Sequence, residues 1–288
     1  MTEFVRVVEM SPRDGLQNEP RLIETADKVA LVDRLSDCGF TKIEVTSFVS
    51  PQWVPQLADA TGVMKNITRK SGVSYCVLTQ NLRGFDAAVA AGADEVAIFA
   101  SASEGFSQKN INCSVAQSIA RFAPVLAAAK AIQMPVRGYV SCVTDCPYDG
   151  PTDPARVADV AAQLIALGCF EISLGDTIGA GTPETVDRML DAVLARLPAG
   201  QLAGHFHDTM GNALANIAVS VDAGLRCFDA SAGGVGGCPY APGAKGNVAS
   251  EKVVQMLHDK GFETGINLQR LKETAVFAQS LKGNNRDL

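Results

Sequence analysis

The chain has 288 residues, a length that one large α/β domain can fill without a second domain. Hydrophobic residues make up 47% of it and charged residues 19%, which indicates a well-filled core and excludes a disordered chain. Its formal net charge of -6 gives no general attraction to nucleic acid or to an anionic membrane. We therefore expect neither as a partner, and any anionic ligand must be held by a local site.

The N-terminal sequence MTEFVRVVEM runs from an acidic residue straight into a strand-like segment, unlike a signal or transit peptide. No apolar run reaches the roughly 18 residues that a membrane span requires. The eight cysteines form no CxxC pair, so a disulfide framework is not expected. These features predict a cytoplasmic protein whose cysteines are mostly reduced and buried.

In chain order, the sequence repeats one unit: a short apolar run, a loop, a helical pattern and a glycine. The apolar runs predict strands starting at Val5, Lys42, Ser74, Glu95, Val136, Phe170, Leu202 and Arg226. Strands that alternate with helices indicate a parallel sheet covered by helices. Eight units predict a single (β/α)8 TIM barrel over residues 1–288, with about 255–288 as a C-terminal helical extension. An open doubly wound sheet is the alternative.

The boundaries of several helices are also legible. Asp153 before Pro154 and Thr182 before Pro183 predict two helix starts, each an N-cap followed by a proline whose missing N–H is not needed there. Glycine suits the residue after a helix, which commonly adopts a left-handed conformation. We expect such helix ends at Gly39, Gly92, Gly168 and Gly224.

Parallel barrels carry their chemistry where strands end and the following loops begin. Polar side chains gather at four of these predicted strand ends. They are Arg13, Asp14 and Gln17, then Glu44 and Ser47, then Asp176 and Thr177, then His205, His207 and Asp208. Each one alone is also compatible with an ordinary hydrophilic loop or a polar layer inside the barrel.

The histidine pair is a sharper signal. Side chains alternate along a strand, so His205 and His207 point to the same side while Phe206 points to the other. This spacing predicts a metal site, with two hydrogen-bonded core histidines as the alternative. Asp14 can add a carboxylate and Asn247 an amide oxygen, and such a mixed nitrogen and oxygen set suits Mg2+ or Mn2+.

A long loop from Gly233 to Glu251 contains six glycines around a single thiol, Cys238. In a barrel this segment is placed to act as an active-site lid, although it also fits a flexible surface loop with an incidental cysteine. The chain lacks the glycine motifs of P-loop, dinucleotide-binding and serine hydrolase proteins. Cys142 and Cys146 lack two further ligands for zinc, and His258 fits a helix surface.

Long motifs resemble those of a known family. They are SPRDGLQNE at Ser11, IEVTSFVSPQWVPQLAD at Ile43, SLGDTIGAGTP at Ser173, GHFHDTMGNALAN at Gly204 and the loop GGVGGCPYAPGAKGNVASE. From Val7 to about Val254 the chain is similar to the bacterial form of the 3-hydroxy-3-methylglutaryl-CoA lyases. Related synthases that condense acetyl-CoA with oxo acids share the barrel and the histidine pair, but the cysteine loop resembles the lyases.

The resemblance implies an enzyme that cleaves (S)-3-hydroxy-3-methylglutaryl-CoA into acetyl-CoA and acetoacetate, a step of leucine degradation and ketone-body formation. It implies a divalent cation, Mg2+ or Mn2+, an acyl-CoA thioester as the small-molecule substrate, and a homodimer. The alternatives are a lyase for a longer 3-substituted glutaryl-CoA, a condensing synthase, a non-catalytic metal or CoA-binding barrel, and a thiol-based redox or zinc sensor that uses Cys142 and Cys146.

The resemblance also assigns residues. The implied metal ligands are Asp14, His205, His207 and Asn247. The implied catalytic residues are Cys238, Arg13, Asp14, His205, Glu44 and Asp176, with Asp14 or His205 as the base and Cys238 as the acid that protonates the enolate carbon. The implied substrate contacts are Arg13, Gln17, Ser47 and Thr177. Lys109, Arg137 and Lys245 are candidates for the CoA phosphates. No cysteine follows Cys238, so the C-terminal thiol regulation of animal relatives is not expected.

Overall fold

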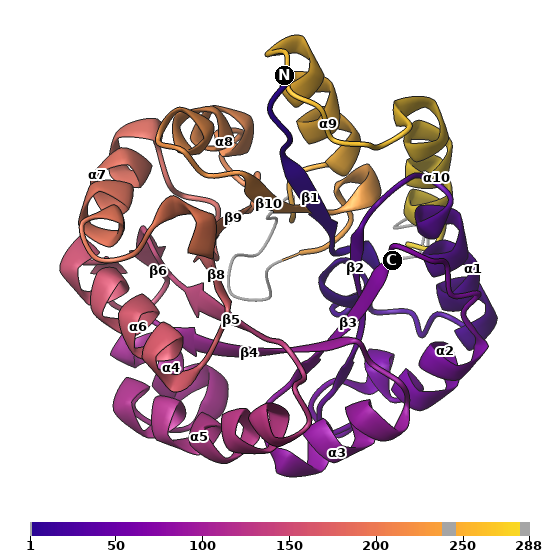
Figure 1. Ribbon diagram of the computed structural model, residues 1–288, viewed down its shortest axis with the longest axis horizontal. Coiled ribbons are helices and arrows are strands. Elements are labelled where there is room, and N and C mark those ends of the chain that lie inside the picture. Colours follow the sequence, from indigo (N-terminus) through magenta and orange to yellow (C-terminus); the bar gives the residue numbers. More distant parts are fainter. Residues whose placement is uncertain (1, 238–245, 283–288) are drawn as a thin grey trace.

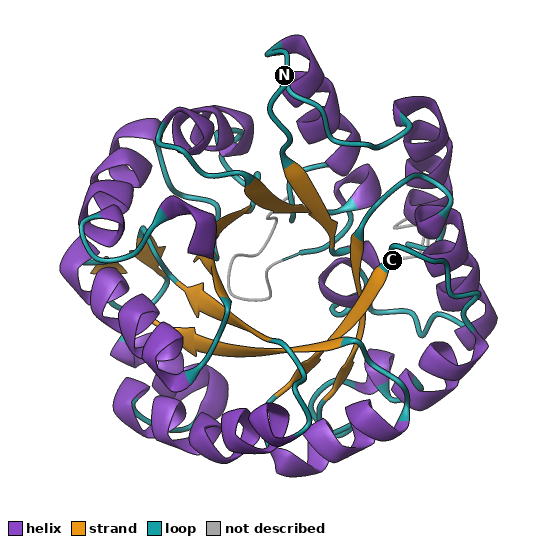
Figure 2. Cartoon of the chain, viewed as in Figure 1, coloured by secondary structure: helices purple, strands orange, loops and turns teal. Residues whose placement is uncertain are grey.

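In the computed structural model of the chain, residues 2–237 and 246–282 are described. Eight parallel strands close into a barrel that is ringed by helices (Figures 1 and 2). The strand order is β1-β10-β9-β8-β5-β4-β3-β2, so the predicted closed barrel is confirmed over the open sheet. The barrel strands are β1 (Arg6–Glu9), β2 (Lys42–Phe48), β3 (Ser74–Thr79), β4 (Glu95–Ser101), β5 (Val136–Ser141), β8 (Glu171–Asp176), β9 (Leu202–Phe206) and β10 (Cys227–Ala230).

The helices of the outer ring follow the strands in chain order. They are α1 (Thr25–Ser36), α2 (Ala60–Asn66), α3 (Leu82–Ala90), α4 (Glu104–Ile111), α5 (Val115–Ala131), α6 (Pro154–Leu167), α7 (Pro183–Leu194), α8 (Ala213–Asp222), α9 (Ser250–Asp259) and α10 (Leu268–Ser280). Short turns are η1 (Ser11–Gly15), η2 (Pro55–Leu57), η3 (Ala199–Gln201) and η4 (Ala232–Gly234). A small hairpin, β6 (Asp145–Cys146) and β7 (Gly150–Pro151), was not predicted.

The predicted helix boundaries are confirmed. The side chain of Asp153 accepts a hydrogen bond from the Ala155 N–H at the start of α6, and Thr182 forms a capping box with Thr185 at the start of α7. Helix α6 ends at Gly168, whose φ of 118° favours glycine.

The interior of the barrel contains charged side chains as well as apolar ones. Arg137 on β5 is only 1% exposed and pairs there with Glu171 and Asp229. The expectation that Arg137 could reach the CoA phosphates is therefore wrong. Alternation along β5 turns Arg137 into the barrel, where buried carboxylates neutralise it.

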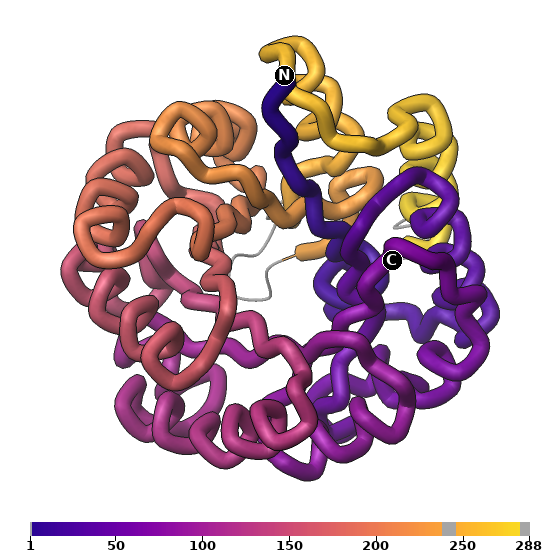
Figure 3. Tube along the Cα trace, in the orientation of Figure 1, coloured from indigo at the N-terminus to yellow at the C-terminus, as the bar shows by residue number. Residues whose placement is uncertain are grey.

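The C-terminal part of the chain closes the ring of helices beside its beginning (Figure 3). Helix α9 follows β10, and α10 packs against α1 and η4. The N–H of Val5 donates to the carbonyl of Glu263, which ties the N-terminal segment to the connection between α9 and α10. Within the described residues, no helix is long and apolar enough to cross a membrane. The seven described cysteines are free and buried.

Candidate active site

The barrel closure brings together residues that lie far apart in sequence. Strand β10 pairs with both β1 and β9, so the loops after β1 and β9 lie at neighbouring positions of one barrel end. Asp14 lies in η1, just after β1, while His205 and His207 lie at the end of β9. One ligand atom from each of the three lies within 4.8 Å of the other two.

The two imidazoles face the same carboxylate oxygen. The Nε2 atoms of His205 and His207 lie 3.8 and 3.7 Å from Oδ2 of Asp14. Phe206 between them is buried in the apolar layer under the helices, as the alternation predicts. Two imidazole nitrogens and a carboxylate oxygen that converge without filling the space between them fit a divalent cation with open positions.

Asn247 joins this cluster from near the C-terminal end of the glycine-rich loop, which runs from Gly233 to Glu251. It forms an isolated bridge with His207, and its Nδ2 donates a 2.7 Å hydrogen bond to Oδ2 of Asp14. A half-turn of the amide would present its oxygen, which is the atom that binds cations. The structure thus brings the four predicted metal ligands to one place.

Arg13 lies beside the cluster between two carboxylates. Its Nε donates to Oε1 of Glu44, and its Nη1 donates to Oδ1 of Asp14 at 2.6 Å. The hydroxyl of Tyr139 donates to the other oxygen of Glu44. This arrangement fixes the guanidinium at the barrel end and leaves Nη2 without a hydrogen-bond partner among the described side chains.

The charges of the site are set by these pairings. Burial opposes ionisation of Asp14, but the charges of Arg13 and of the two histidines outweigh it and hold the pKa of Asp14 well below its usual range. Burial alone would lower the pKa of Arg13, but the carboxylates of Glu44 and Asp14 raise it. Asp14 is therefore an anion at neutral pH, as a cation ligand must be.

Asp176 is close to the cluster but turned toward its own loop. Its carboxylate accepts hydrogen bonds from Thr144 at 2.9 Å and from the N–H groups of Ala180 and Gly181 at 3.2 and 2.9 Å. Burial raises its pKa. In this structure Asp176 orders the loop after β8 and is not one of the three convergent ligands.

The three predicted substrate contacts other than Arg13 differ in their surroundings. The Thr177 hydroxyl accepts a 2.8 Å hydrogen bond from the N–H of Cys142. The hydroxyl of Ser47 is buried at the end of β2 and has no hydrogen-bond partner among the described residues. Gln17 is half-buried in the turn after η1. Ser47 thus has a free hydroxyl for a ligand, whereas the Thr177 hydroxyl already accepts a hydrogen bond from a backbone N–H.

The described ends of the glycine-rich loop meet at the site. A side chain at Gly246, which has a φ of +79°, would collide with the carbonyl of Gly236. The Asn18 side chain donates to the carbonyl of Gly237 at 3.0 Å. Cys238 and Lys245 lie outside the described residues. Lys109 is exposed on α4, and His258 is exposed on α9, as expected.

Glu9, which the sequence reading did not single out, anchors both ends of this loop. Its Oε1 accepts from the N–H groups of Ser11 and Ala232 at 2.8 and 2.9 Å, and its Oε2 accepts from the Ser250 hydroxyl at 2.7 Å. It is fully buried, and burial raises its pKa. One carboxylate therefore joins the segment that leads to Arg13 to the start and the end of the loop.

Asp229 was also missed, although a charged residue inside the apolar run RCFDASAG was a visible signal. It is buried on β10, and its Oδ2 lies 3.2 Å from Nδ1 of His205. Burial raises its pKa, but Arg137 and His205 outweigh this and lower it. Asp229 therefore supports one of the candidate metal ligands from inside the barrel.

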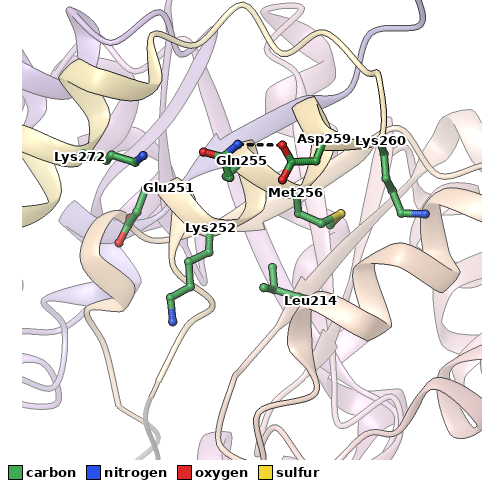
Figure 4. A pocket seen from close by; sticks show the side chains of 8 residues that line it. All are labelled: Leu214, Glu251, Lys252, Gln255, Met256, Asp259, Lys260 and Lys272. Atoms are coloured by element: carbon green, nitrogen blue, oxygen red, sulfur yellow. Dashed lines mark hydrogen bonds between the residues drawn. The ribbon is translucent and has the colours of Figure 1, made fainter.

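A surface pocket lies elsewhere, over the outer sides of α8, α9 and α10 (Figure 4). Three lysines and two acids line it, and Gln255 and Asp259 hydrogen-bond to each other there. None of the cluster residues takes part in it. The site is therefore identified by convergent chemistry and not by this hollow.

The fold and the cluster define a (β/α)8-barrel enzyme with a candidate metal centre at the carboxyl end of its strands. A protein-family model described as HMGL-like matches residues 4–277. The chain belongs to the HMGL-like family.

Several relatives are similar over nearly their whole length. The crystal structure of the HMG-CoA lyase from Brucella melitensis is 62% identical, covers 97% of this chain and 99% of its own, and superposes with a TM-score of 0.96. A Pseudomonas aeruginosa protein named 3-hydroxy-3-isohexenylglutaryl-CoA/hydroxy-methylglutaryl-CoA lyase is 55% identical over 93% of this chain and 89% of its own. An HMG-CoA lyase from Acinetobacter baumannii, in complex with coenzyme A and 3-methylmalate, is 36% identical with a TM-score of 0.92, covering 99% of this chain and 97% of its own.

Proposed function

We propose that this chain cleaves (S)-3-hydroxy-3-methylglutaryl-CoA into acetyl-CoA and acetoacetate. The observation that carries the proposal is the convergence of Asp14, His205 and His207 beside Arg13, in a chain 62% identical to an HMG-CoA lyase. In the reaction the bond between C2 and C3 breaks. The tertiary hydroxyl loses its proton and becomes the ketone of acetoacetate, while the electron pair passes to the acetyl-CoA fragment as an enolate, which then takes up a proton.

The donor set fits a divalent cation, and Asp14, His205, His207 and Asn247 would hold it. Imidazole, carboxylate and amide oxygen with open positions suit Mg2+ or Mn2+, whereas a closed zinc site would use thiolates. When bound, such a cation acidifies a substrate hydroxyl and neutralises developing negative charge. The Nε2 atoms of His205 and His207 lie 3.8 and 3.7 Å from Oδ2 of Asp14, beyond hydrogen-bond distance, which supports a ligand set that is incomplete in the protein alone.

Arg13 is the group that we assign to the enolate oxygen. Glu44 and Asp14 fix two of its nitrogens, so the guanidinium needs little reorganisation energy when negative charge develops on the substrate. Glu44 acts on Arg13 and is itself buried, which makes it a positioning residue in this proposal.

Two groups are candidates for the base that takes the hydroxyl proton. Asp14 is ionised, and Nε2 of His205 faces it at 3.8 Å, so either can be placed beside the hydroxyl. His205 can accept the proton only while its Nε2 is not bound to the cation. Cys238 is proposed from the sequence as the acid that protonates the enolate carbon, since an ordinary thiol is still protonated at pH 7.

The remaining assignments concern binding. Gln17, Ser47 and Thr177 are proposed to contact the substrate, with Ser47 best placed because its buried hydroxyl is free within the described part. Asp176 is proposed to hold the loop that carries Thr177. Lys109 and Lys245 remain proposals for the CoA phosphates. We also propose that the protein is cytoplasmic and forms a homodimer. Light scattering on the purified protein tests the dimer.

The longer-chain substrate is the second candidate, and the name of the Pseudomonas aeruginosa relative favours it. The test is to supply the purified chain with 3-hydroxy-3-methylglutaryl-CoA and with its 3-isohexenyl homologue, in the presence of Mg2+ or Mn2+. We expect acetyl-CoA and acetoacetate in equal amounts from the first and a lower kcat/KM on the second. No product from either thioester would refute both candidates and favour a non-catalytic barrel.

A further inference from the structure

We propose that Asp229 is a positioning residue that selects the Nδ1–H tautomer of His205 and so aims the Nε2 lone pair at the candidate metal centre. The inference deepens the proposed function, because it depends on His205 being a ligand there. It concerns a residue that lies outside the cluster and inside the barrel.

The backbone register places the two residues side by side. Asp229 on β10 pairs directly with His205 on β9 in the parallel ladder. Both side chains enter the barrel interior, where Oδ2 of Asp229 lies 3.2 Å from Nδ1 of His205. The Ser173 hydroxyl donates to the same oxygen at 2.7 Å.

The direction of the hydrogen bond follows from the other partners of Asp229. Arg137 binds both of its oxygens, with Nη2 at 2.8 Å from Oδ1 and Nη1 at 3.0 Å from Oδ2. A carboxylate held by a buried guanidinium is an acceptor only. Nδ1 of His205 must therefore be the donor, so in the neutral imidazole Nε2 has no proton, and this nitrogen faces Asp14.

Metal-binding imidazoles need this arrangement, because the nitrogen that binds must offer a lone pair while the other nitrogen donates to a fixed acceptor. His207 lacks such a support, since its Nδ1 has no hydrogen-bond partner among the described residues. The two histidines thus differ: a carboxylate holds the Nδ1 atom of His205, and no described residue holds that of His207. The tautomer of His207 can therefore be compared with that of His205 in the same protein.

Arg137 extends the support to the other half of the site. Its Nη1 also donates to the Tyr139 hydroxyl at 2.9 Å, and that hydroxyl in turn donates to Glu44, the partner of Arg13. The buried guanidinium of Arg137 therefore contacts Asp229 directly and reaches Glu44 through the Tyr139 hydroxyl. A substitution at Asp229 should nonetheless act on His205 first, because Asp229 hydrogen-bonds to it directly and Arg137 acts on it through Asp229.

The test uses nitrogen-15 NMR of the imidazoles in the full chain at pH 8 with EDTA. The chain has only three histidines, so single substitutions assign every signal. We expect His205 of the unmodified protein to be the Nδ1–H tautomer. Finding the Nε2–H tautomer there would overturn the proposal, and the tautomer itself is observed in the unmodified protein.

The variant Asp229→Asn completes the test. Its amide can donate to Nδ1, so we expect His205 to shift toward the Nε2–H tautomer and Mn2+ affinity, measured by calorimetry, to fall about 10- to 100-fold. The matched control Ser173→Ala removes a hydrogen bond to the same oxygen but keeps the carboxylate, and should retain the tautomer and Mn2+ affinity. An Asp229→Asn protein with unchanged tautomer and Mn2+ affinity would refute the proposal. Neither the tautomer nor the Mn2+ affinity depends on turnover. A protein that shows both as expected but does not cleave the thioester would refute the proposed function and leave this proposal standing.

Discussion

Asn247 donates a 2.7 Å hydrogen bond to Asp14, although 233 residues separate them in the sequence. The contact exists because β10 and β1 are neighbours in the closed barrel, so the loop after β10 returns over the turn after β1. It joins the end of the glycine-rich loop to the only carboxylate of the convergent cluster in the described chain. Loop position and the charge of the site are therefore physically linked.

Removing either cluster histidine should weaken cation binding. For His205→Ala and His207→Ala we expect Mn2+ affinity to fall at least about 10-fold, since each change deletes one imidazole ligand. Calorimetric titration of the EDTA-treated protein measures it. His258→Ala is the matched control, because His258 is exposed on α9, and it should bind Mn2+ like the unmodified chain. Equal affinities in all three variants would refute the ligand assignment.

Neutralising Glu44 should reduce turnover by loosening Arg13. In Glu44→Gln the buried ion pair is lost and one amide oxygen remains to accept from both Arg13 and Tyr139, so we expect kcat to fall roughly 100-fold with little change in Mn2+ affinity. Steady-state kinetics provide the measurement.

The control for this variant is Glu95→Gln at the opposite end of the barrel. Glu95 is also buried and paired, with Lys42 at 2.6 Å, so its replacement should cost stability but leave kcat unchanged. If both variants lost turnover equally, the effect of Glu44 would be one of general stability.

Glu9 should make stability depend on pH in a defined direction. Burial raises its pKa in the folded state, so its ionisation opposes folding. The opposing contribution is absent below the ordinary glutamate pKa of about 4.3 and complete above the raised folded value. In Glu9→Gln an amide can keep the same three contacts without charge.

The free energy of unfolding of Glu9→Gln, relative to the unmodified chain, should therefore increase as pH rises through that window. Urea titrations at several pH values measure it. Glu9→Ala should instead lose about 1–3 kcal/mol for each N–H left unpaired at Ser11 and Ala232. A pH-independent difference between the Gln variant and the unmodified chain would contradict the account.

Alkylation of the native protein should distinguish Cys238 from the other thiols. The seven described cysteines are buried, and burial raises the pKa of Cys227 to about 11 and that of Cys169 to about 12. We expect mass spectrometry after brief iodoacetamide treatment to find the label on Cys238. Label on Cys142 and Cys146 that spares Cys238 would favour a thiol-based sensor.

The role of that thiol has its own test. Cys238→Ser should lose turnover but keep Mn2+ affinity, because a serine hydroxyl is a much weaker acid than a thiol. Full turnover in this variant would remove Cys238 from the mechanism.

The sequence predicted the barrel because its signals are local and repeated. Five of the eight predicted strands begin at the expected residue, and Asp153 and Thr182 mark their helices correctly. The HxH spacing, together with the rule that barrel chemistry gathers at the strand ends, also predicts that Asp14 lies near His205. These features depend on alternation, capping and strand order, which one sequence contains.

The supporting residues could not be predicted in the same way. Glu9, Arg137 and Asp229 lie within apolar strands, and their partners come from other strands at a register that only barrel closure sets. For this reason the sequence alone allows Arg137 to be a surface contact for phosphates, whereas in the structure it neutralises buried carboxylates. The small hairpin after β5 escaped notice because each of its strands has two residues.

The central claim is that the cluster of Asp14, His205 and His207 supports metal-dependent cleavage of the thioester. Its most direct test is to measure acetoacetate released from 3-hydroxy-3-methylglutaryl-CoA by the EDTA-treated chain, before and after Mg2+ or Mn2+ is added. We predict negligible release without the cation and a saturable recovery with it. Release that is unaffected by EDTA, or absent with either cation, would contradict the account.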